Sequence, residues 1–453
     1  MPSPPRALRT LLAAVATLAP AVVLAAATDD SASARLRAHS AQFTPQVVQM
    51  ADNVFVAVGY SAANVTLVQG PQGAIIVDTG ANPSDAQAIV AAFGTRLKPQ
   101  VKAIIYTHGH PDHTGGASVF AALGTPAIYS HQLLLDAPPE AARGPRDGGD
   151  AFGTHVAAAD YINAGVQLDY GRRVAHTRSG YLPPDHTFSG PRLQLAIAGE
   201  TLQLLHTPGE TPENIAVWLP GSRTLLAGDD YYPTFPNLSP IRGTRLRPPA
   251  AWIASLDLMR TLGAEHLVPG HLRPISGARA VDDALRNYRD AIDSVTTQTL
   301  AGIARGATPD ELAAQVALPP ALASDPYLQE FYGGVAWSVR GIYADAVGWF
   351  DGNATHLFPL PAAARAQRLV PLLGGARAVQ QQAQQALQEG DAQLAAELCD
   401  HLLALDGNDM ATRRLKARAL RALAHAQINA TARNYYLSSA EYLESDPALG
   451  ARP

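Results

Sequence analysis

The stretch over residues 107–116 constrains the fold of this chain most strongly, because it gathers histidines and an aspartate into one short loop. It reads Thr-His-Gly-His-Pro-Asp-His-Thr-Gly-Gly and directly follows the apolar, β-branched run 101–106, which is typical of a buried strand. Gly109 and Pro111 end that strand, so we expect the polar side chains on a loop at its carboxyl end.

Imidazoles and a carboxylate this close together need a cation to compensate their burial. Neutral imidazole and ionised carboxylate are common ligands of zinc and related divalent metals, and burying such groups without a partner is costly. A solvated turn rich in histidine is the alternative. The pattern His-x-His-x-Asp-His between a strand and Gly-Gly argues against it, so we predict a metal site.

Length and composition allow two domains. The chain has 453 residues, of which 47% are hydrophobic, and single cores seldom grow beyond about 250–300 residues. The formal net charge is -5 and no basic cluster stands out, so we expect no nucleic-acid partner. Cys399 is the only cysteine, which excludes an intramolecular disulfide, and its apolar helical pattern predicts a small core residue.

The first 27 residues have the pattern of a secretory signal peptide. Arg6 and Arg9 precede the apolar stretch 11–24, and three alanines at 25–27 offer a cleavage site. The apolar stretch is short for a membrane span and is interrupted by Pro20. We therefore expect an exported chain, periplasmic or secreted, that does not span a membrane.

Further acidic and histidine side chains also follow predicted strands. Asp78 follows the apolar run 74–77, and Glu210 stands in Thr-Pro-Gly-Glu-Thr after a predicted hairpin. Asp229 ends Thr-Leu-Leu-Ala-Gly-Asp, and His271 follows Leu-Val-Pro-Gly. Each residue is a weak signal alone, but their shared place at the ends of strands makes the set strong. The alternation of strand and helix patterns predicts a sheet covered by helix.

Residues 138–190 are rich in Gly, Pro, Asp and Arg and show little periodicity. This composition predicts a long insertion over the site that could supply walls facing a substrate. The histidines in or near it are expected at the surface or as caps.

These motifs resemble the metallo-β-lactamase superfamily, whose hydrolases carry such a loop on a two-sheet αββα sandwich. The resemblance implies two Zn²⁺ per subunit with these ligands: His108, His110 and Glu210 for one ion, Asp112, His113 and His271 for the other, and Asp229 for both. It also implies that Asp78 lies beneath the loop and orients the ligands. A helix cap is the alternative role of Asp78.

A narrower resemblance, to the alkyl sulfatases, starts from Glu210, where many superfamily relatives have histidine. The spacing of 19 residues to Asp229 and the pattern Asn-Leu-x-x-x-Arg-Gly from Asn237 are similar to that family. So is His-Leu-Arg-Pro at 271–274. The resemblance implies a small amphiphilic sulfate ester as substrate, with its sulfate held by Asn237 and Arg242. A surface ion pair is the alternative for Arg242.

The last third of the chain resembles the dimerisation domain of the alkyl sulfatases. Apolar residues at three- and four-residue spacing over 378–387, 391–405 and 411–426 predict helical hairpins of tetratricopeptide type. Such hairpins need another surface to cover them, and a second subunit or the chain's own catalytic domain could provide it. We expect a homodimer, with a catalytic domain over 28–290, a helical domain over 291–445 and a tail over 446–453.

The sequence departs from the alkyl sulfatase pattern near the expected general acid. Family members commonly have glutamate at the place of Asp229, and histidines at the places of Pro233 and Pro236. Tyr231 and Tyr232 are the candidate proton donors because they stand close to Asp229.

Two divalent ions about 3.5–4 Å apart lower the pKa of a shared water to about 7, so we count Asp112 and Asp229 as catalytic residues as well as ligands. The sequence thus predicts a dinuclear-zinc hydrolase that cleaves alkyl sulfates. A hydrolase of the same fold that acts on another ester or an amide is the nearest alternative. A non-catalytic binding protein is the third.

Overall fold

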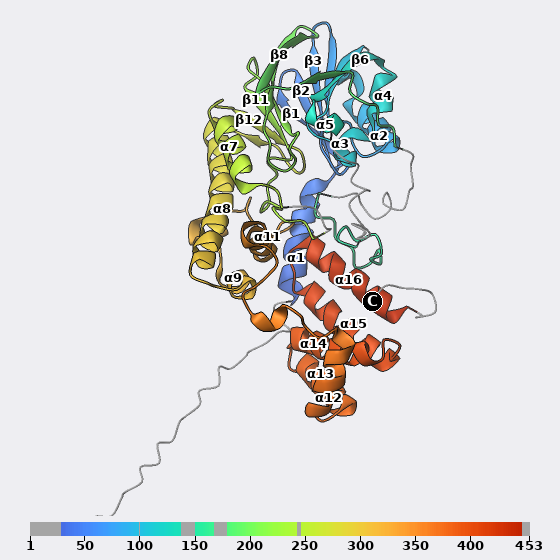
Figure 1. Ribbon diagram of the computed structural model, residues 1–453. Coiled ribbons are helices and arrows are strands. Elements are labelled where there is room, and N and C mark those ends of the chain that lie inside the picture. The colour runs from blue at the N-terminus through green and yellow to red at the C-terminus, as the bar shows by residue number, and fades with distance from the viewer. Residues whose placement is uncertain (1–28, 99, 137–149, 167–178, 242–245, 446–453) are drawn as a thin grey trace, which may run out of the picture.

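The computed structural model describes residues 29–98, 100–136, 150–166, 179–241 and 246–445 (Figure 1). A sandwich of two sheets forms one end of the molecule, and the C-terminal helices form the other (Figure 1). The predicted fold class, an αββα sandwich followed by an all-helical region, is confirmed.

The strands of the described residues form one seven-stranded and one six-stranded sheet. The first follows chain order: β1 (Gln46–Ala51), β2 (Val54–Val58), β3 (Val65–Gly70), β4 (Gly73–Val77), β5 (Val101–Ile105), β6 (Gly124–His131) and β7 (His186–Phe188). The second has the order β13 (Ile275–Ser276), β12 (His266–Pro269), β11 (Thr224–Gly228), β10 (Ile215–Leu219), β9 (Glu200–His206) and β8 (Arg192–Ile197).

Strand direction brings the carboxyl ends of several strands to one edge of the sandwich. In the first sheet β4 and β5 are parallel. In the second sheet β9 and β11 both run antiparallel to β10, and β12 is parallel to β11. The segments after β5, β9, β11 and β12 therefore lie where the two sheets can join their side chains in one site.

Alternating side chains build the core between the sheets. Val54, Val56 and Val58 of β2 share one buried cluster with Ile215 and Val217 of β10. The residues between them face outward into the layers that cover each sheet. This two-residue period is what a strand buried on both faces requires.

Helices cover both outer faces of the sandwich. On the first sheet α2 (Pro83–Phe93) and α4 (Ala117–Ala121) pack through Ile89, Phe93 and Phe120. On the second sheet α7 (Pro249–Arg260) and α8 (Ala278–Ala304) pack through Trp252 and Leu285, among others. Since α8 is one continuous helix, it runs across residue 290, where the sequence placed the boundary between the domains.

The remaining helices of the described residues are short or belong to the lower half of the molecule (Figure 1). They are α1 (Asp29–Ser40), η1 (Ala41–Phe43), η2 (Gly94–Arg96), α3 (Pro111–Thr114), α5 (Leu133–Asp136), α9 (Pro309–Gln315), α10 (Pro320–Ala323), α11 (Val335–Val347), η4 (Ala354–His356), α12 (Ala362–Leu372), α13 (Ala376–Gln388), α14 (Ala392–Leu405), α15 (Met410–His425) and α16 (Ala430–Glu444). Helices α13, α14 and α15 coincide with the three predicted helical segments.

The last helix packs against the chain's own insertion. The amide of Asn434 donates to the carbonyl oxygen of Ala151 at 3.2 Å, and the hydroxyl of Tyr442 donates to Asp150 at 2.9 Å. Leu437 packs with Val156. Part of the surface needed by the helical hairpins is thus provided by the described part of the insertion, residues 150–166.

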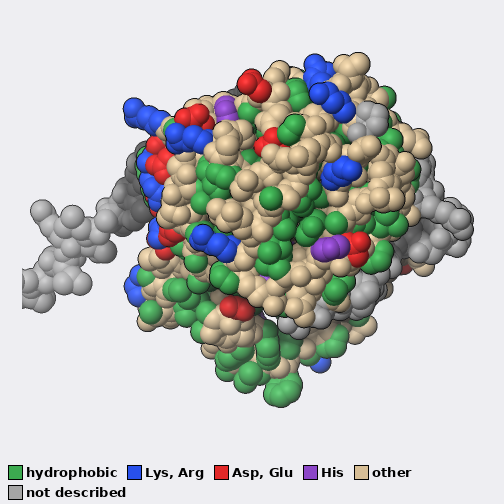
Figure 2. All heavy atoms as spheres, turned by 90° about the horizontal axis from the view of Figure 1, so that it is seen from above, with side chains coloured by type: hydrophobic (Ala, Val, Ile, Leu, Met, Phe, Trp, Pro, Cys, Tyr) green, Lys and Arg blue, Asp and Glu red, His purple; other side chains and the backbone are tan. Residues whose placement is uncertain are grey.

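Charged side chains of both signs are mixed on the sandwich end of the molecule (Figure 2). Along α8, for example, Arg289 lies 3.0 Å from Asp293 and also pairs with Asp257 of α7. Across the described ranges, no helix combines the length and apolar character needed to cross a membrane.

Candidate metal centre

The loop after β5 carries the first ligand candidates and is closed by the short helix α3. Pro111 occupies the first turn of α3, where its missing N–H costs nothing, and His110 precedes the helix. The N–H of His113 donates to the carbonyl oxygen of His110 at 3.1 Å, which turns His113 back toward His108. Both His108 and His113 are fully buried.

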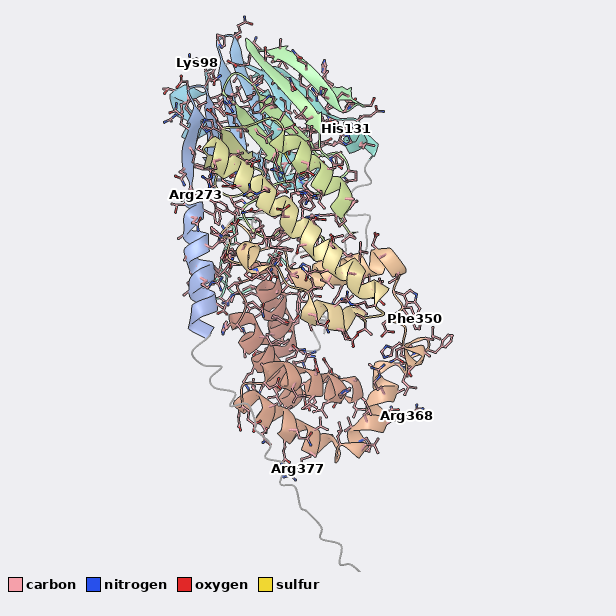
Figure 3. All side chains as sticks on the ribbon, turned by 90° about the vertical axis from the view of Figure 1, so that its left-hand side faces the viewer. Lys98, His131, Arg273, Phe350, Arg368 and Arg377 are labelled. Atoms are coloured by element: carbon pink, nitrogen blue, oxygen red, sulfur yellow. The ribbon has the colours of Figure 1, made fainter. Side chains whose placement is uncertain are left out.

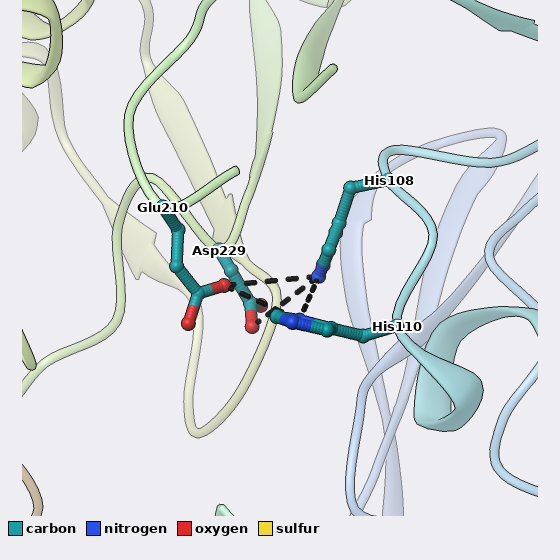
Figure 4. Close-up of side chains that lie close together, drawn as sticks. All are labelled: His108, His110, Glu210 and Asp229. Carbon is teal, nitrogen blue, oxygen red and sulfur yellow. Dashed lines mark hydrogen bonds and ion pairs between the residues drawn. The ribbon is translucent and has the colours of Figure 1, made fainter. Parts of the chain in front are cut away.

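Four side chains from the two sheets form the first donor group. His108 and His110 come from the first sheet, and Glu210 and Asp229 come from the second, as Figure 4 shows. Nε2 of His108 lies 3.7 Å from Oε2 of Glu210 and 3.7 Å from Oδ2 of Asp229. Nδ1 of His110 is also 3.7 Å from Oε2 of Glu210.

A second donor group lies beside the first and shares Asp229 with it. Asp112, His113 and His271 form this group. Nε2 of His271 lies 3.5 Å from Oδ2 of Asp112, and 3.2 Å from Oδ2 of Asp229. Oδ1 of Asp229 lies 3.3 Å from Nε2 of His113. Asp229 therefore faces both groups, as a bridging ligand would.

The fit of this site to metal ions rests on its buried polar atoms. Nε2 of His113 and Oδ1 of Asp229 are buried, and neither has a hydrogen-bond partner among the described residues. Two such atoms 3.3 Å apart are costly unless a proton on His113 or a bound cation compensates them, and the imidazole–carboxylate donor set suits a divalent cation. Gly270 permits the arrangement, because a Cβ atom there would overlap Oδ1 of Asp229.

Hydrogen bonds behind the imidazoles fix their orientation. Nδ1 of His113 lies 2.8 Å from Oδ2 of Asp78, and Nδ1 of His271 lies 2.8 Å from the carbonyl oxygen of Ala62. Each acceptor places the ring proton on Nδ1, which leaves Nε2 unprotonated and facing the centre. His108 follows the same rule, because its Nδ1 lies 3.1 Å from the hydroxyl of Thr107, whose own proton goes to Asp78.

The electrostatics of His108 and Asp229 favour ligand forms. Burial lowers the pKa of His108 well below its usual value, and the neighbouring His113 lowers it further, so His108 stays neutral. Burial alone would raise the pKa of Asp229, but the imidazoles of His271, His113 and His108 outweigh that effect and hold it well below its usual value. Burial lowers the pKa of His113 and His271, but the neighbouring carboxylates, chiefly Asp229, together outweigh it and raise that pKa, so these two imidazoles bind a metal on losing a proton. Neutral imidazole and ionised carboxylate are the forms that bind divalent metals.

The other predicted site residues lie at different distances from the centre. Asn237 is buried, and its N–H donates to the hydroxyl oxygen of Tyr232 at 2.9 Å. The ring centroid of Tyr232 is 6.4 Å from that of His271. Tyr231 and Tyr232 share one core cluster, and the Tyr231 ring lies 5.0 Å from that of Tyr288. Arg242 lies outside the described residues.

Sequence reasoning missed three residues that support the ligands. Arg247 forms a buried ion pair with Glu210. Asp230 accepts a hydrogen bond from the N–H of Glu210 at 2.9 Å, and Glu213 accepts one from the N–H of Gly109 at 3.2 Å. The second aspartate in Asp229-Asp230 was a visible signal, whereas Arg247 stands in no recognisable motif.

The fold and the paired donor groups define a hydrolase-type centre of the metallo-β-lactamase superfamily. A family model described as metallo-beta-lactamase superfamily matches residues 58–271, and one described as alkyl sulfatase dimerisation matches residues 308–446. The chain is 39% identical over 390 residues to a linear primary-alkylsulfatase of a Pseudomonas species, covering 83% of this chain and 73% of that protein. The chain belongs to the alkylsulfatase family.

Two further relatives agree with this assignment. An (R)-specific secondary-alkylsulfatase of a Pseudomonas species is 28% identical over 400 residues, which cover 84% of this chain and 60% of that protein. The solved structure of the stereoselective inverting sec-alkylsulfatase Pisa1 from a Pseudomonas species has a TM-score of 0.78 at 26% identity, covering 88% of this chain and 66% of that one. The chain thus spans about three fifths to three quarters of the length of these three relatives.

Proposed function

We propose that this chain hydrolyses alkyl sulfate esters to an alcohol and inorganic sulfate at a centre that holds two Zn²⁺. One observation carries the proposal: two donor groups share Asp229, and Glu210 completes the first of them. The linear primary-alkylsulfatase that is 39% identical supports the substrate class.

The described side chains divide between the two ions. His108, His110 and Glu210 would hold one ion, Asp112, His113 and His271 the other, and Asp229 both. Two ions bound there would lower the pKa of a shared water to about 7 and supply hydroxide at neutral pH. Asp78 and the carbonyl of Ala62 keep Nε2 of His113 and His271 directed at the centre.

Asn237 and Arg242 are the proposed sulfate-binding residues. Asn237 would bind sulfate through its side-chain NH2 group, which can donate to a sulfate oxygen; its buried Oδ1 only accepts and has no partner among the described residues. A guanidinium such as that of Arg242 offers a planar fork of donors to a tetrahedral oxyanion.

Tyr232 is a better candidate than Tyr231 for the proton donor to the leaving alkoxide. Its ring lies beside His271, and its oxygen already accepts a hydrogen bond from Asn237, so its own proton can be donated. Burial raises the pKa of Tyr232 well above its usual value, and the nearby Glu210 raises it further, which keeps the hydroxyl protonated.

We also propose that the chain is exported and acts as a homodimer. The first 27 residues have the composition of a signal peptide. The match of residues 308–446 to the alkyl sulfatase dimerisation model supports the dimer.

The test is a metal count combined with a substrate panel. The purified chain should hold two zinc ions and release sulfate from dodecyl sulfate, and His110→Ala should abolish that release while Arg242→Ala weakens it strongly. Turnover of only a phosphate ester, a lactam or a thioester would favour the alternative hydrolase, which Pro233 and Pro236 keep open. Absence of both metal and turnover would leave a binding protein.

A further inference from the structure

Arg247 is a buried cation that contacts a proposed metal ligand. The side chains of Arg247 and Glu210 are 5% and 2% exposed, and Nη1 of Arg247 lies 2.5 Å from Oε1 of Glu210. The other carboxylate oxygen, Oε2, faces Nε2 of His108 and Nδ1 of His110, each at 3.7 Å. The two oxygens of Glu210 are therefore divided between different partners.

We propose that Arg247 is a positioning residue that makes Glu210 a ligand through Oε2 alone. A carboxylate can bind a metal through one oxygen or both, and a charge-assisted hydrogen bond from a guanidinium engages one of them. Because Arg247 holds Oε1, it leaves Oε2 as the donor atom that points at His108 and His110. It also compensates the carboxylate charge, which would be costly to bury unpaired.

The same guanidinium connects this ligand to the segment that carries Asn237. Nη1 of Arg247 donates to the carbonyl oxygen of Asn237 at 2.9 Å, and the backbone N–H of Arg247 donates to the carbonyl oxygen of Leu238 at 2.9 Å. Arg247 thus fixes both Glu210 and the backbone of the proposed sulfate-binding residue. Its loss should disturb metal binding and substrate binding together. This part of the inference rests on the proposed function.

The role of Arg247 can be tested because a histidine at position 210 could replace the Glu210–Arg247 pair as a metal ligand. The Glu210–Arg247 pair is neutral overall and offers the metal one atom, and a neutral imidazole at the same place would do the same. In a Glu210→His background Arg247 would have no carboxylate to hold. Removing Arg247 should then be harmless or favourable, because a buried guanidinium without a partner is itself costly.

The experiment titrates metal-free protein with Zn²⁺ against a chromophoric chelator. Arg247→Met should weaken one of the two binding steps about 10- to 100-fold, the range found when a group that orients a metal ligand is removed. The other step should lose less affinity, because Arg247 pairs with Glu210, a ligand of the first donor group only. Arg247→Lys keeps the charge but not the fork, so its loss should be intermediate. The double variant Glu210→His/Arg247→Met should bind zinc at least as tightly as Glu210→His.

Arg260→Met is the matched control, because Arg260 is a partly exposed arginine of the same domain that pairs with Asp257 and Asp282 on the outer helices. It should bind zinc as the wild type does. Circular dichroism of each metal-free variant checks that it folds, and if Arg247→Met does not fold, Arg247→Lys and the double variant decide by the same criteria.

Wild-type zinc affinity in Arg247→Met, or an equal loss in both backgrounds, would overturn the role of Arg247. A wild-type chain that binds zinc but releases no sulfate would overturn only the proposed function. A wild-type chain that binds no zinc would overturn both.

Discussion

Nδ1 of His113 lies 2.8 Å from Oδ2 of Asp78, and this contact connects the end of β4 with the loop after β5. The carboxylate of Asp78 also accepts hydrogen bonds from the N–H and the hydroxyl of Thr107, each at 2.8 Å. Asp78 has a φ of 57°, in the left-handed region. The backbone of Asp78 is therefore strained, while its buried carboxylate accepts three hydrogen bonds. The geometry of the loop keeps both features in place.

Asp78→Asn should therefore weaken zinc binding without unfolding the chain. Asparagine tolerates the left-handed backbone, but one end of its amide is a donor, so it cannot accept all three hydrogen bonds that Asp78 accepts from Thr107 and His113. The affinity for zinc should fall about 10- to 100-fold, measured by titration of the metal-free protein. Asp310→Asn, at an exposed acid that pairs with Arg340, should leave it unchanged. Wild-type zinc affinity in Asp78→Asn would show that the carboxylate only supports the backbone.

Asn64 holds the loop that carries His271. Its amide donates to the carbonyl oxygens of Pro269 and Leu272 at 3.0 and 2.8 Å, and its N–H donates to the carbonyl oxygen of Gly270. Leu272 has a φ of 74°, so the loop is strained and depends on these contacts.

Asn64→Ala should lower the free energy of unfolding by about 2–4 kcal/mol, because it leaves buried carbonyl groups without donors. Urea titrations in the presence of a metal chelator measure the effect on the protein alone. Gln393→Ala, on an exposed face of α14, is the control and should change stability by less than about 0.5 kcal/mol. Similar values for the two variants would mean that the loop keeps its shape without Asn64.

Local sequence patterns were sufficient to predict the side chains that the structure brings together in the two donor groups. Each predicted ligand stands in the loop or short helix that follows a strand whose hydrophobic pattern is visible, and strand direction brings those strand ends to one edge of the sandwich. Asp78 could be placed in the same way, because it too follows a buried strand. The helices α13, α14 and α15 were predictable from their apolar periodicity.

Contacts made through loops could not be predicted. Arg247 contacts Glu210 and the carbonyl of Asn237 although it is far from Glu210 in the sequence, and no periodic pattern predicts such a contact. Tyr231 and Tyr232 were indistinguishable in sequence, and both rings contact Tyr288, but of the two only Tyr232 has a ring contact with His271 among the described residues.

His39 should make the stability of the fold depend on pH. Its ring is buried, stacks on Phe331 with centroids 3.9 Å apart, and lies 3.2 Å from the carbonyl oxygen of Ala164. Burial lowers the pKa of His39 from 6.5 to about 4, against the opposing effect of that carbonyl. Between these values the unfolded chain binds a proton that the folded chain does not, so the stability falls as the pH falls from about 6.5 to about 4.

The variant His39→Phe isolates this effect, because it keeps the stacking ring and removes the titrating group. From pH 7.5 to 4.5 the free energy of unfolding should fall by about 2–3 kcal/mol more in the wild type than in the variant. At pH 7.5 the difference in unfolding free energy between the wild type and the variant measures the change in packing. The change in that difference between pH 7.5 and 4.5 measures the effect of protonating His39. Parallel pH curves for the two proteins would contradict the prediction.

The segment over residues 347–360 should lie in the dimer interface. Trp349 and Phe358 are 74% and 93% exposed, and Val347, Leu357 and Leu360 are exposed as well. Phe350, in the same segment, lies at the outer margin of the molecule (Figure 3). Exposed apolar side chains gathered in this way are typical of an interface, and the segment falls inside the region that matches the alkyl sulfatase dimerisation model.

Phe358→Glu should therefore weaken the dimer at least about tenfold, because each subunit would have to bury a charge in place of an aromatic side chain. Sedimentation velocity over a concentration series measures the dissociation constant. Leu135→Glu is the matched control, because Leu135 is an exposed leucine on α5 at the sandwich end and lies outside the dimerisation match. If both variants dimerise as the wild type does, the two subunits meet elsewhere, and the apolar segment has another partner.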